Sequence, residues 1–208
     1  SWADQVVKHT GKPVLILAPL AVSPQTRDEG VKFGIQVTLC RSQDEVKPGI
    51  NITNYEILDK FDTSVFSGVV LDESSILKNF TGKVRTQIIE TFKDTPYKLA
   101  CTATPAPNDH MELGNHAEFL GVMNRNEMLS LFFVHDVTNI QDWRLKGHAS
   151  KSFWSWVASW AVMLQNPRDL GYDGSQFDLP PLHITPEVVV PAETAFFYKK
   201  ASSLTDRR

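Results

Sequence analysis

Short β-prone runs alternate with segments of helical spacing along the first half of the chain. Continuous apolar runs, such as residues 14–18 and 68–71, are typical of strands buried on both faces of a sheet. The predicted strands are 14–18, 36–39, 50–53, 68–71 and 97–101, and the predicted helices are 1–9, 25–33, 57–61 and 83–91. This alternation predicts an α/β fold with a mostly parallel sheet flanked by helices.

From His110 onward the pattern becomes helical. Apolar residues spaced three and four apart predict an amphipathic helix with a broad apolar face, made by Phe153, Trp156, Val157, Trp160, Met163 and Leu164. We expect a linker at 178–181, then a strand at 188–190 and a helix at 193–202.

Composition excludes several classes of protein. The 208 residues carry 21 Lys and Arg against 24 Asp and Glu, a formal net charge of −3, which excludes a strongly basic nucleic-acid coat but not a local basic groove. Hydrophobic residues make up 42% of the chain, which excludes a disordered protein. Cys40 and Cys101 are too few for a disulfide scaffold, so we expect reduced thiols. The longest apolar run, 14–22, is about half a membrane span, so we expect no membrane partner.

Polar residues follow four of the predicted strands at the point where each strand ends. They are Pro19, Thr53, Asn54, Asp72, Glu73, Thr102 and Thr104. Because ligands bind outside the carboxyl ends of the strands in parallel α/β sheets, these residues predict a site at that edge.

Asp72 and Glu73 are the strongest chemical signal. An acidic pair at the end of a hydrophobic strand suits a nucleoside triphosphatase, in which the Asp holds Mg²⁺ and the Glu polarises the attacking water. Thr102 and Thr104 could sense the γ-phosphate region and pass its state elsewhere. Each feature also has an ordinary interpretation, as a solvent-facing strand–turn boundary and as a turn.

Five segments, in order, resemble the motifs of superfamily 2 helicases in the version found in Swi/Snf-type translocases. Residues 72–79 (Asp-Glu-Ser-Ser-Ile-Leu-Lys-Asn) resemble motif II, and Thr102-Ala103-Thr104-Pro105 resembles motif III. The remaining similarities are Leu17-Ala18-Pro19 to motif Ia, residues 52–56 to motif Ib, and Asn108, Glu112-Leu113 and Phe119-Leu120 to the family's continuation of motif III.

The resemblance implies the first RecA-like lobe of an ATP-dependent DNA helicase or translocase, with ATP and Mg²⁺ as cofactors. By the resemblance, Asp72 binds Mg²⁺, Glu73 is the catalytic base, and Thr102 and Thr104 couple nucleotide state to the grip on DNA. The implied nucleic-acid contacts are Pro19, Thr53 and Asn54. The implied partners are nucleic acid, DNA in preference to RNA, and a second RecA-like lobe of the same chain, in the cytoplasm or nucleoid.

Two departures from the family qualify this expectation. Ser74-Ser75 replaces the usual Ala/Gly-His, so a histidine that commonly couples motif II to its neighbours is absent. No phosphate loop is present, because neither Gly11-Lys12 nor Gly82-Lys83 has Ser or Thr after it or Gly five positions before it. We therefore expect a chain truncated after that loop, and inactive by itself.

The expected organisation is a RecA-like ATPase lobe at 1–125, a helical appendage at 126–175, and a linker with the start of a second lobe at 176–208. Without the phosphate-loop strand, the strand at 97–101 should form an open edge of the sheet, and the chain alone should be marginally stable.

Two further patterns carry alternatives. Bases interleave with tryptophans over residues 143–156, which could stack single-stranded nucleic acid, but helical spacing favours core packing. His110 and His116 fit no common zinc spacing, and we expect both at the surface. A non-catalytic module that binds nucleic acid or protein, and a subunit of a nuclease or restriction system, are the alternative functions.

Overall fold

The computed structural model describes residues 1–78, 82–135 and 143–186. It divides into two compact units, Ser1–Ala161 and Val162–Arg208. The domain boundaries expected at residues 125 and 175 stay predictions.

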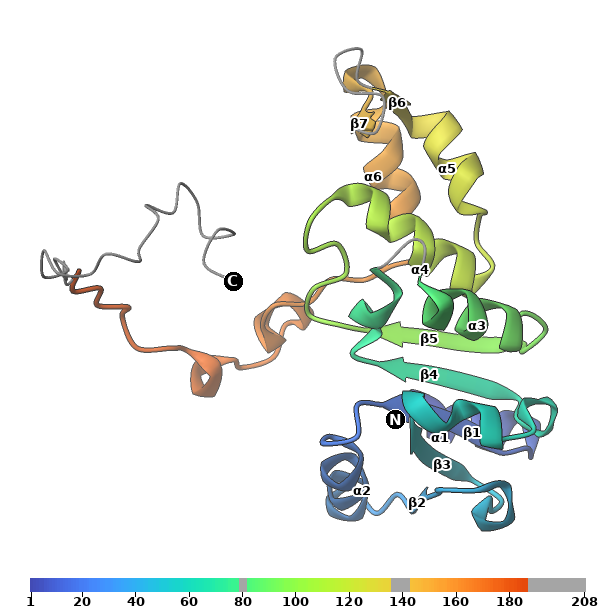
Figure 1. The fold of residues 1–208 in the computed structure, drawn as a ribbon. Coiled ribbons are helices and arrows are strands. Elements are labelled where there is room, and N and C mark those ends of the chain that lie inside the picture. The colour runs from blue at the N-terminus through green and yellow to red at the C-terminus, as the bar shows by residue number, and fades with distance from the viewer. Residues whose placement is uncertain (79–81, 136–142, 187–208) are drawn as a thin grey trace, which may run out of the picture. The chain divides into compact units, whose positions relative to one another are not determined.

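A five-stranded parallel sheet forms the centre of the first unit (Figure 1). Its strands lie in the order β2–β3–β1–β4–β5, and they are β1 (Val14–Ala18), β2 (Val37–Leu39), β3 (Ile50–Asn54), β4 (Gly68–Asp72) and β5 (Tyr97–Cys101). The five strands predicted between residues 14 and 101 are all present, and the α/β fold is confirmed. Within the described residues β5 lies at the edge of the sheet, as expected.

Helices cover both faces of the sheet. Alternation along the strands sends Val14 and Val70 to one face, where they pack against Ala3 and Val6 of α1 (Trp2–Thr10). Gly68 allows this close approach, since a Cβ there would lie 3.1 Å from the Val6 side chain. The opposite face packs against α3 (Lys83–Thr91) and α4 (Leu113–Leu120), and its cluster includes Leu15, Leu17, Val69, Leu71, Ile88, Phe92 and Phe119.

The connections contain one further helix and two short 3₁₀ segments that bear on the site. Helix α2 (Ser23–Lys32) joins β1 to β2, η2 (Tyr55–Lys60) follows β3, and η4 (Ser74–Lys78) follows β4. The predicted helices at 25–33 and 57–61 are therefore confirmed in place, the second as a 3₁₀ helix.

Beyond α4, a small helical part completes the first unit. It comprises α5 (Arg125–Phe132), the antiparallel ribbon β6 (Phe133–His135) and β7 (Trp143–Leu145), and α6 (Ser150–Ala158). The fully buried ring of Phe153 lies at its centre, against Phe132 and Phe133. A third apolar cluster joins this part to Leu113 of α4.

The predicted helix through Leu164 is wrong at its carboxyl end. Backbone bonds from Ser159 N to Trp156 O and from Trp160 N to Val157 O tighten the last turn, and α6 ends at Ala158. Met163 and Leu164 are 78% and 52% exposed, so among the described residues these side chains gain little of the burial that stabilises a helix.

In the second unit, the described residues form short turns. Arg168 donates two hydrogen bonds of 2.7 Å to the Asp178 carboxylate, and residues 178–181 have no helix or strand. The strand and helix predicted at 188–190 and 193–202 lie outside the described residues. No helix in the described part of the chain is long and apolar enough to cross a membrane.

Candidate nucleotide and nucleic-acid site

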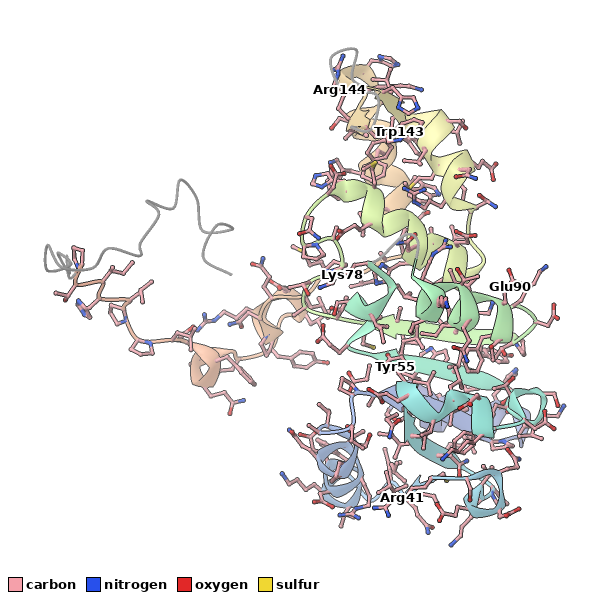
Figure 2. The ribbon with its side chains drawn as sticks, viewed as in Figure 1. Arg41, Tyr55, Lys78, Glu90, Trp143 and Arg144 are labelled. Carbon is pink, nitrogen blue, oxygen red and sulfur yellow. The ribbon has the colours of Figure 1, made fainter. Side chains whose placement is uncertain are left out.

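The parallel register brings the predicted site residues to one edge of the sheet. Ala18 pairs with Asn54, and Asp72 pairs with Cys101, so Pro19, Glu73 and Thr102 all follow strands that end together. Figure 2 shows Tyr55 and Lys78, from the segments after β3 and β4, toward this edge, whereas Glu90 lies at the opposite end of the sheet.

Asp72 is the last residue of β4, and its side chain is half-buried. Burial raises the pKa of its carboxyl group, and the negative charges of Glu73 and Glu29 act in the same direction, against a backbone hydrogen bond from Glu73. A carboxylate in such a position is stabilised by a bound cation.

The donor set at this edge can be compared with the needs of Mg²⁺ and ATP. The described residues contain no group of three or more acidic, Cys or His side chains that could hold a metal ion. Mg²⁺ is commonly held by one or two carboxylates together with substrate phosphates, so Asp72 alone fits that ion. The fit to ATP is incomplete, because the 208-residue sequence has no phosphate-loop motif.

Glu73 has an unusual backbone. Its φ of 55° is in the left-handed region, and among the described residues every other positive φ belongs to glycine. Its carboxylate oxygen Oε1 accepts hydrogen bonds from Ser75 Oγ at 2.8 Å and from Thr102 Oγ1 at 3.0 Å. Strained backbone of this kind is found at functional sites, where surrounding contacts maintain it.

The two threonines after β5 are joined to Glu73 in different ways. Thr102 Oγ1 donates to Glu73 and accepts the backbone N–H of Thr104 at 3.1 Å. The side chain of Thr104 is exposed. The structure therefore brings Glu73 and Thr102 into direct contact and links Thr104 through its backbone.

At the end of β3, the two successive residues Thr53 and Asn54 differ in whether their side chains can reach a partner. Thr53 is 1% exposed, and its hydroxyl has no hydrogen-bond partner among the described residues. Asn54 is half-buried, and its Oδ1 accepts the N–H of Glu56 at 3.1 Å. Pro19, at the end of β1, is half-buried. In this pair, Asn54 is the side chain available to a partner.

Sequence reasoning missed Tyr55. Its buried hydroxyl donates a 2.8 Å hydrogen bond to the backbone carbonyl of Asp72, and burial raises the pKa of that hydroxyl. An aromatic residue with a polar tip directly after a strand end was the available signal, since such residues pair their hydroxyl when buried.

His116 was also missed, and the surface position expected for it is wrong. It lies on α4, is 4% exposed, and its Nε2 is 3.1 Å from Ser74 Oγ. Burial lowers the pKa of the imidazole. The apolar residues around it in α4 place this face of the helix in the core. His110 is exposed, as expected.

The tryptophan-rich stretch is mainly packing. Trp143 and Trp156 are partly buried against the cluster around Phe153, whereas Trp154 is 45% exposed. Lys146 donates to the carbonyls of Ser130 and Leu131 at the end of α5. Core packing is thus confirmed for Trp143 and Trp156.

Comparison with known proteins supports the fold. No family model and no curated protein match this sequence. The structure is similar to the SWI2/SNF2 ATPase core of Sulfolobus solfataricus, solved in complex with dsDNA, with a TM-score of 0.58 and 22% identity. The match covers 76% of this chain and 35% of that chain, so this chain spans about a third of the protein it resembles.

Proposed function

We propose that this chain is the first RecA-like lobe of an ATP-dependent DNA translocase or helicase. The proposal rests on the arrangement at the carboxyl edge of the parallel sheet, where Glu73 follows Asp72 at the end of β4 and accepts a hydrogen bond from Thr102, which follows β5. The fold similarity to an ATPase core that was solved with dsDNA supports it.

The roles follow from chemistry and position. Asp72 would hold Mg²⁺, which when bound neutralises charge on the phosphates of ATP. Glu73 would take the proton of the attacking water, with Thr102 orienting its carboxylate. Cleavage then joins the water oxygen to the γ-phosphorus as the bond from that phosphorus to the β–γ bridging oxygen breaks.

The contact with DNA would come from the loops after β1 and β3. Pro19 follows β1 directly, and Thr53 and Asn54 are the last two residues of β3. Thr53 is buried, so its backbone would support the contact, whereas Asn54 offers a half-buried amide at the edge of the sheet. Contacts of this kind with the phosphate backbone do not depend on base sequence and weaken with salt. A second RecA-like lobe would complete the ATP site.

A pair of asparagines gives a matched test of the DNA contact. Asn54 and Asn124 each cap a helical segment by accepting a backbone N–H, from Glu56 and from Asn126. Aspartate also caps helices, so Asn54→Asp and Asn124→Asp each add one negative charge while retaining the cap. Only Asn54 lies at the proposed DNA edge.

The measurement is fluorescence anisotropy of a labelled DNA duplex titrated with the 208-residue chain at two salt concentrations. We expect Asn54→Asp to raise Kd by at least about tenfold, because a like charge faces the phosphates, and Asn124→Asp to leave Kd nearly unchanged. Equal effects of the two variants, or binding that does not weaken with salt, would contradict the assignment of the DNA contact.

A non-catalytic binding module is the second candidate, and it differs from the ATPase in having no phosphate loop encoded with this lobe. The nucleotide sequence upstream of Ser1 in the same reading frame distinguishes the ATPase lobe from the binding module. A Gly-x-x-x-x-Gly-Lys-Ser/Thr sequence upstream of Ser1 favours the ATPase, and a start codon directly before the Ser1 codon favours the binding module.

A further inference from the structure

Helix α4 buries two adjacent polar side chains on a surface that is otherwise apolar. Asn115 is 0% exposed and His116 is 4% exposed, beside Leu113, Ala117 and Phe119. Burying an amide and an imidazole costs free energy unless both are hydrogen-bonded. The hydrogen bonds that Asn115 and His116 form therefore indicate why these two polar side chains are buried.

Both side chains reach the same short segment, η4 (Ser74–Lys78). His116 Nε2 lies 3.1 Å from Ser74 Oγ, and Asn115 Nδ2 donates to the carbonyl of Leu77 at 2.7 Å. Ser74 and Leu77 are themselves fully buried. Helix α4 thus holds this segment near both of its ends.

The segment begins directly after Glu73, whose backbone is left-handed. A glutamate at a φ of 55° keeps that conformation only when its surroundings impose it. On one side, Glu73 is the continuation of the sheet, since Asp72 is paired with Cys101. On the other side, the first residue after Glu73 is Ser74, which contacts His116.

We propose that Asn115 and His116 are positioning residues that hold Glu73 in its left-handed conformation and so direct its carboxylate to Thr102. The side chains of α4 fix η4, η4 fixes the backbone after Glu73, and the carboxylate then lies 3.0 Å from Thr102 Oγ1. The conformational claim concerns this chain alone; its consequence for catalysis rests on the proposed function.

His116 suits this role as a neutral ring. The charged or polar groups that act on it are Glu112, the N-cap residue of α4, and Ser74. As a neutral ring, it offers one nitrogen to the Ser74 hydroxyl, and the tautomer sets which atom donates. The position that this family commonly gives to a histidine within motif II is Ser75 here, so in this chain an imidazole contacts the motif from α4 instead.

The test uses isotope-labelled 208-residue chain and NMR. A positive φ gives a strong nuclear Overhauser effect between the amide proton and the Hα of the same residue, which reports Glu73 directly. We expect this signal in the unmodified chain and its weakening in Asn115→Ala and His116→Leu. Amides of Ser74–Lys78 should exchange about three- to tenfold faster in both variants, the opening expected from one lost hydrogen bond.

Two further variants separate positioning from stability. Asn51 is a buried amide in β3, bonded to Lys47 at the other end of the sheet, so Asn51→Ala is a control for loss of a buried amide without contact to η4. Ser74→Ala with His116→Leu removes both partners and avoids an unpaired buried group, which keeps the chain folded. We expect the Glu73 signal to be unchanged in the first and weakened in the second.

Three outcomes overturn the proposal: a Glu73 signal unchanged in all α4 variants, equal loss in Asn51→Ala, or no positive φ at Glu73 in the unmodified chain.

The catalytic consequence has its own assay, ATP hydrolysis by the protein encoded in the full reading frame. There His116→Leu should lower kcat about tenfold with little change in KM, and His116→Gln should retain part of the rate that His116→Leu loses. Absence of hydrolysis in the unmodified protein refutes the proposed function and leaves the NMR result to decide the conformational claim.

Discussion

Thr102 Oγ1 donates a 3.0 Å hydrogen bond to Glu73 Oε1, and this bond joins the segments that follow two neighbouring strands, β5 and β4. It connects the segment predicted to hydrolyse ATP with the segment predicted to report on the nucleotide. The bond is direct, involves a charged acceptor, and is supplemented by Ser75 Oγ on the same oxygen.

Replacing Thr102 tests that bond. Thr102→Val keeps the shape of the side chain and removes the hydroxyl, whereas Thr102→Ser keeps the hydroxyl. Because Thr102 is half-buried, we expect Thr102→Val to lower the free energy of unfolding by up to about 1 kcal/mol, and Thr102→Ser to lower it by less. Urea denaturation followed by circular dichroism measures both. A larger loss in the serine variant would show that the methyl group, and not the hydroxyl, is what matters.

The left-handed backbone of Glu73 predicts an order between two substitutions that both remove its carboxylate. Glu73→Gly relieves the clash of Cβ with the backbone at a φ of 55°, and Glu73→Ala does not. We expect the glycine variant to be more stable than the alanine variant by about 1 kcal/mol. Thermal unfolding compares them. If alanine is the more stable, as in an ordinary helix or strand, Glu73 does not have this conformation in solution.

Because the pKa of Asp72 is raised, we expect the chain to become more stable when the Asp72 carboxyl group is replaced by an amide. A carboxyl group whose pKa is higher in the folded state than in the unfolded state retains its proton longer when folded, so the folded state loses stability as pH rises from 3.8 through the raised value. We expect Asp72→Asn to stabilise the chain at pH 7 and to have little effect at pH 3.

Asp62 is the control of opposite sign for that experiment. Its pKa is lowered by hydrogen bonds from the hydroxyl and the backbone N–H of Ser64. Its contribution to stability is present above 3.8 and is lost as pH falls, so Asp62→Asn should destabilise at pH 7. Thermal midpoints across a pH series decide: the same sign for both variants would contradict the assigned environments.

Tyr55 predicts a link between the β3 loop and the acidic strand end. Tyr55→Phe leaves the carbonyl of Asp72 without its 2.8 Å donor, so we expect a loss of about 1 kcal/mol of unfolding free energy. Tyr172→Phe, at a side chain that is 69% exposed, should have almost no effect. Urea titrations measure both, and equal effects would mean that the Tyr55 hydroxyl bond is not formed in solution.

The strands and the edge that carries the site could be predicted from sequence because both follow from local pattern. Apolar runs such as Val14–Ala18 bury both faces, and polar residues such as Asp72 mark the point where burial ends. The parallel order then brings these ends together without further information.

Other features depend on tertiary contacts that no local pattern contains. The helical spacing of residues 153–164 continues beyond Ala158, but Met163 is exposed to solvent among the described residues. Histidine is a polar residue type that is often found at the surface, and only the packing of α4 on the sheet places His116 against Ser74. The positive φ of Glu73 is imposed by those same contacts, so sequence gives no sign of it.

If Asp72 and Glu73 belong to an ATP-hydrolysing lobe that acts on DNA, one assay can test both properties. The most direct measurement is ATP hydrolysis by the protein encoded in the full reading frame, with and without duplex DNA, beside its Glu73→Gln variant. We expect hydrolysis that DNA stimulates and that falls at least about 100-fold in Glu73→Gln while ATP binding is retained. Hydrolysis that survives Glu73→Gln, or that is indifferent to DNA, would contradict this assignment.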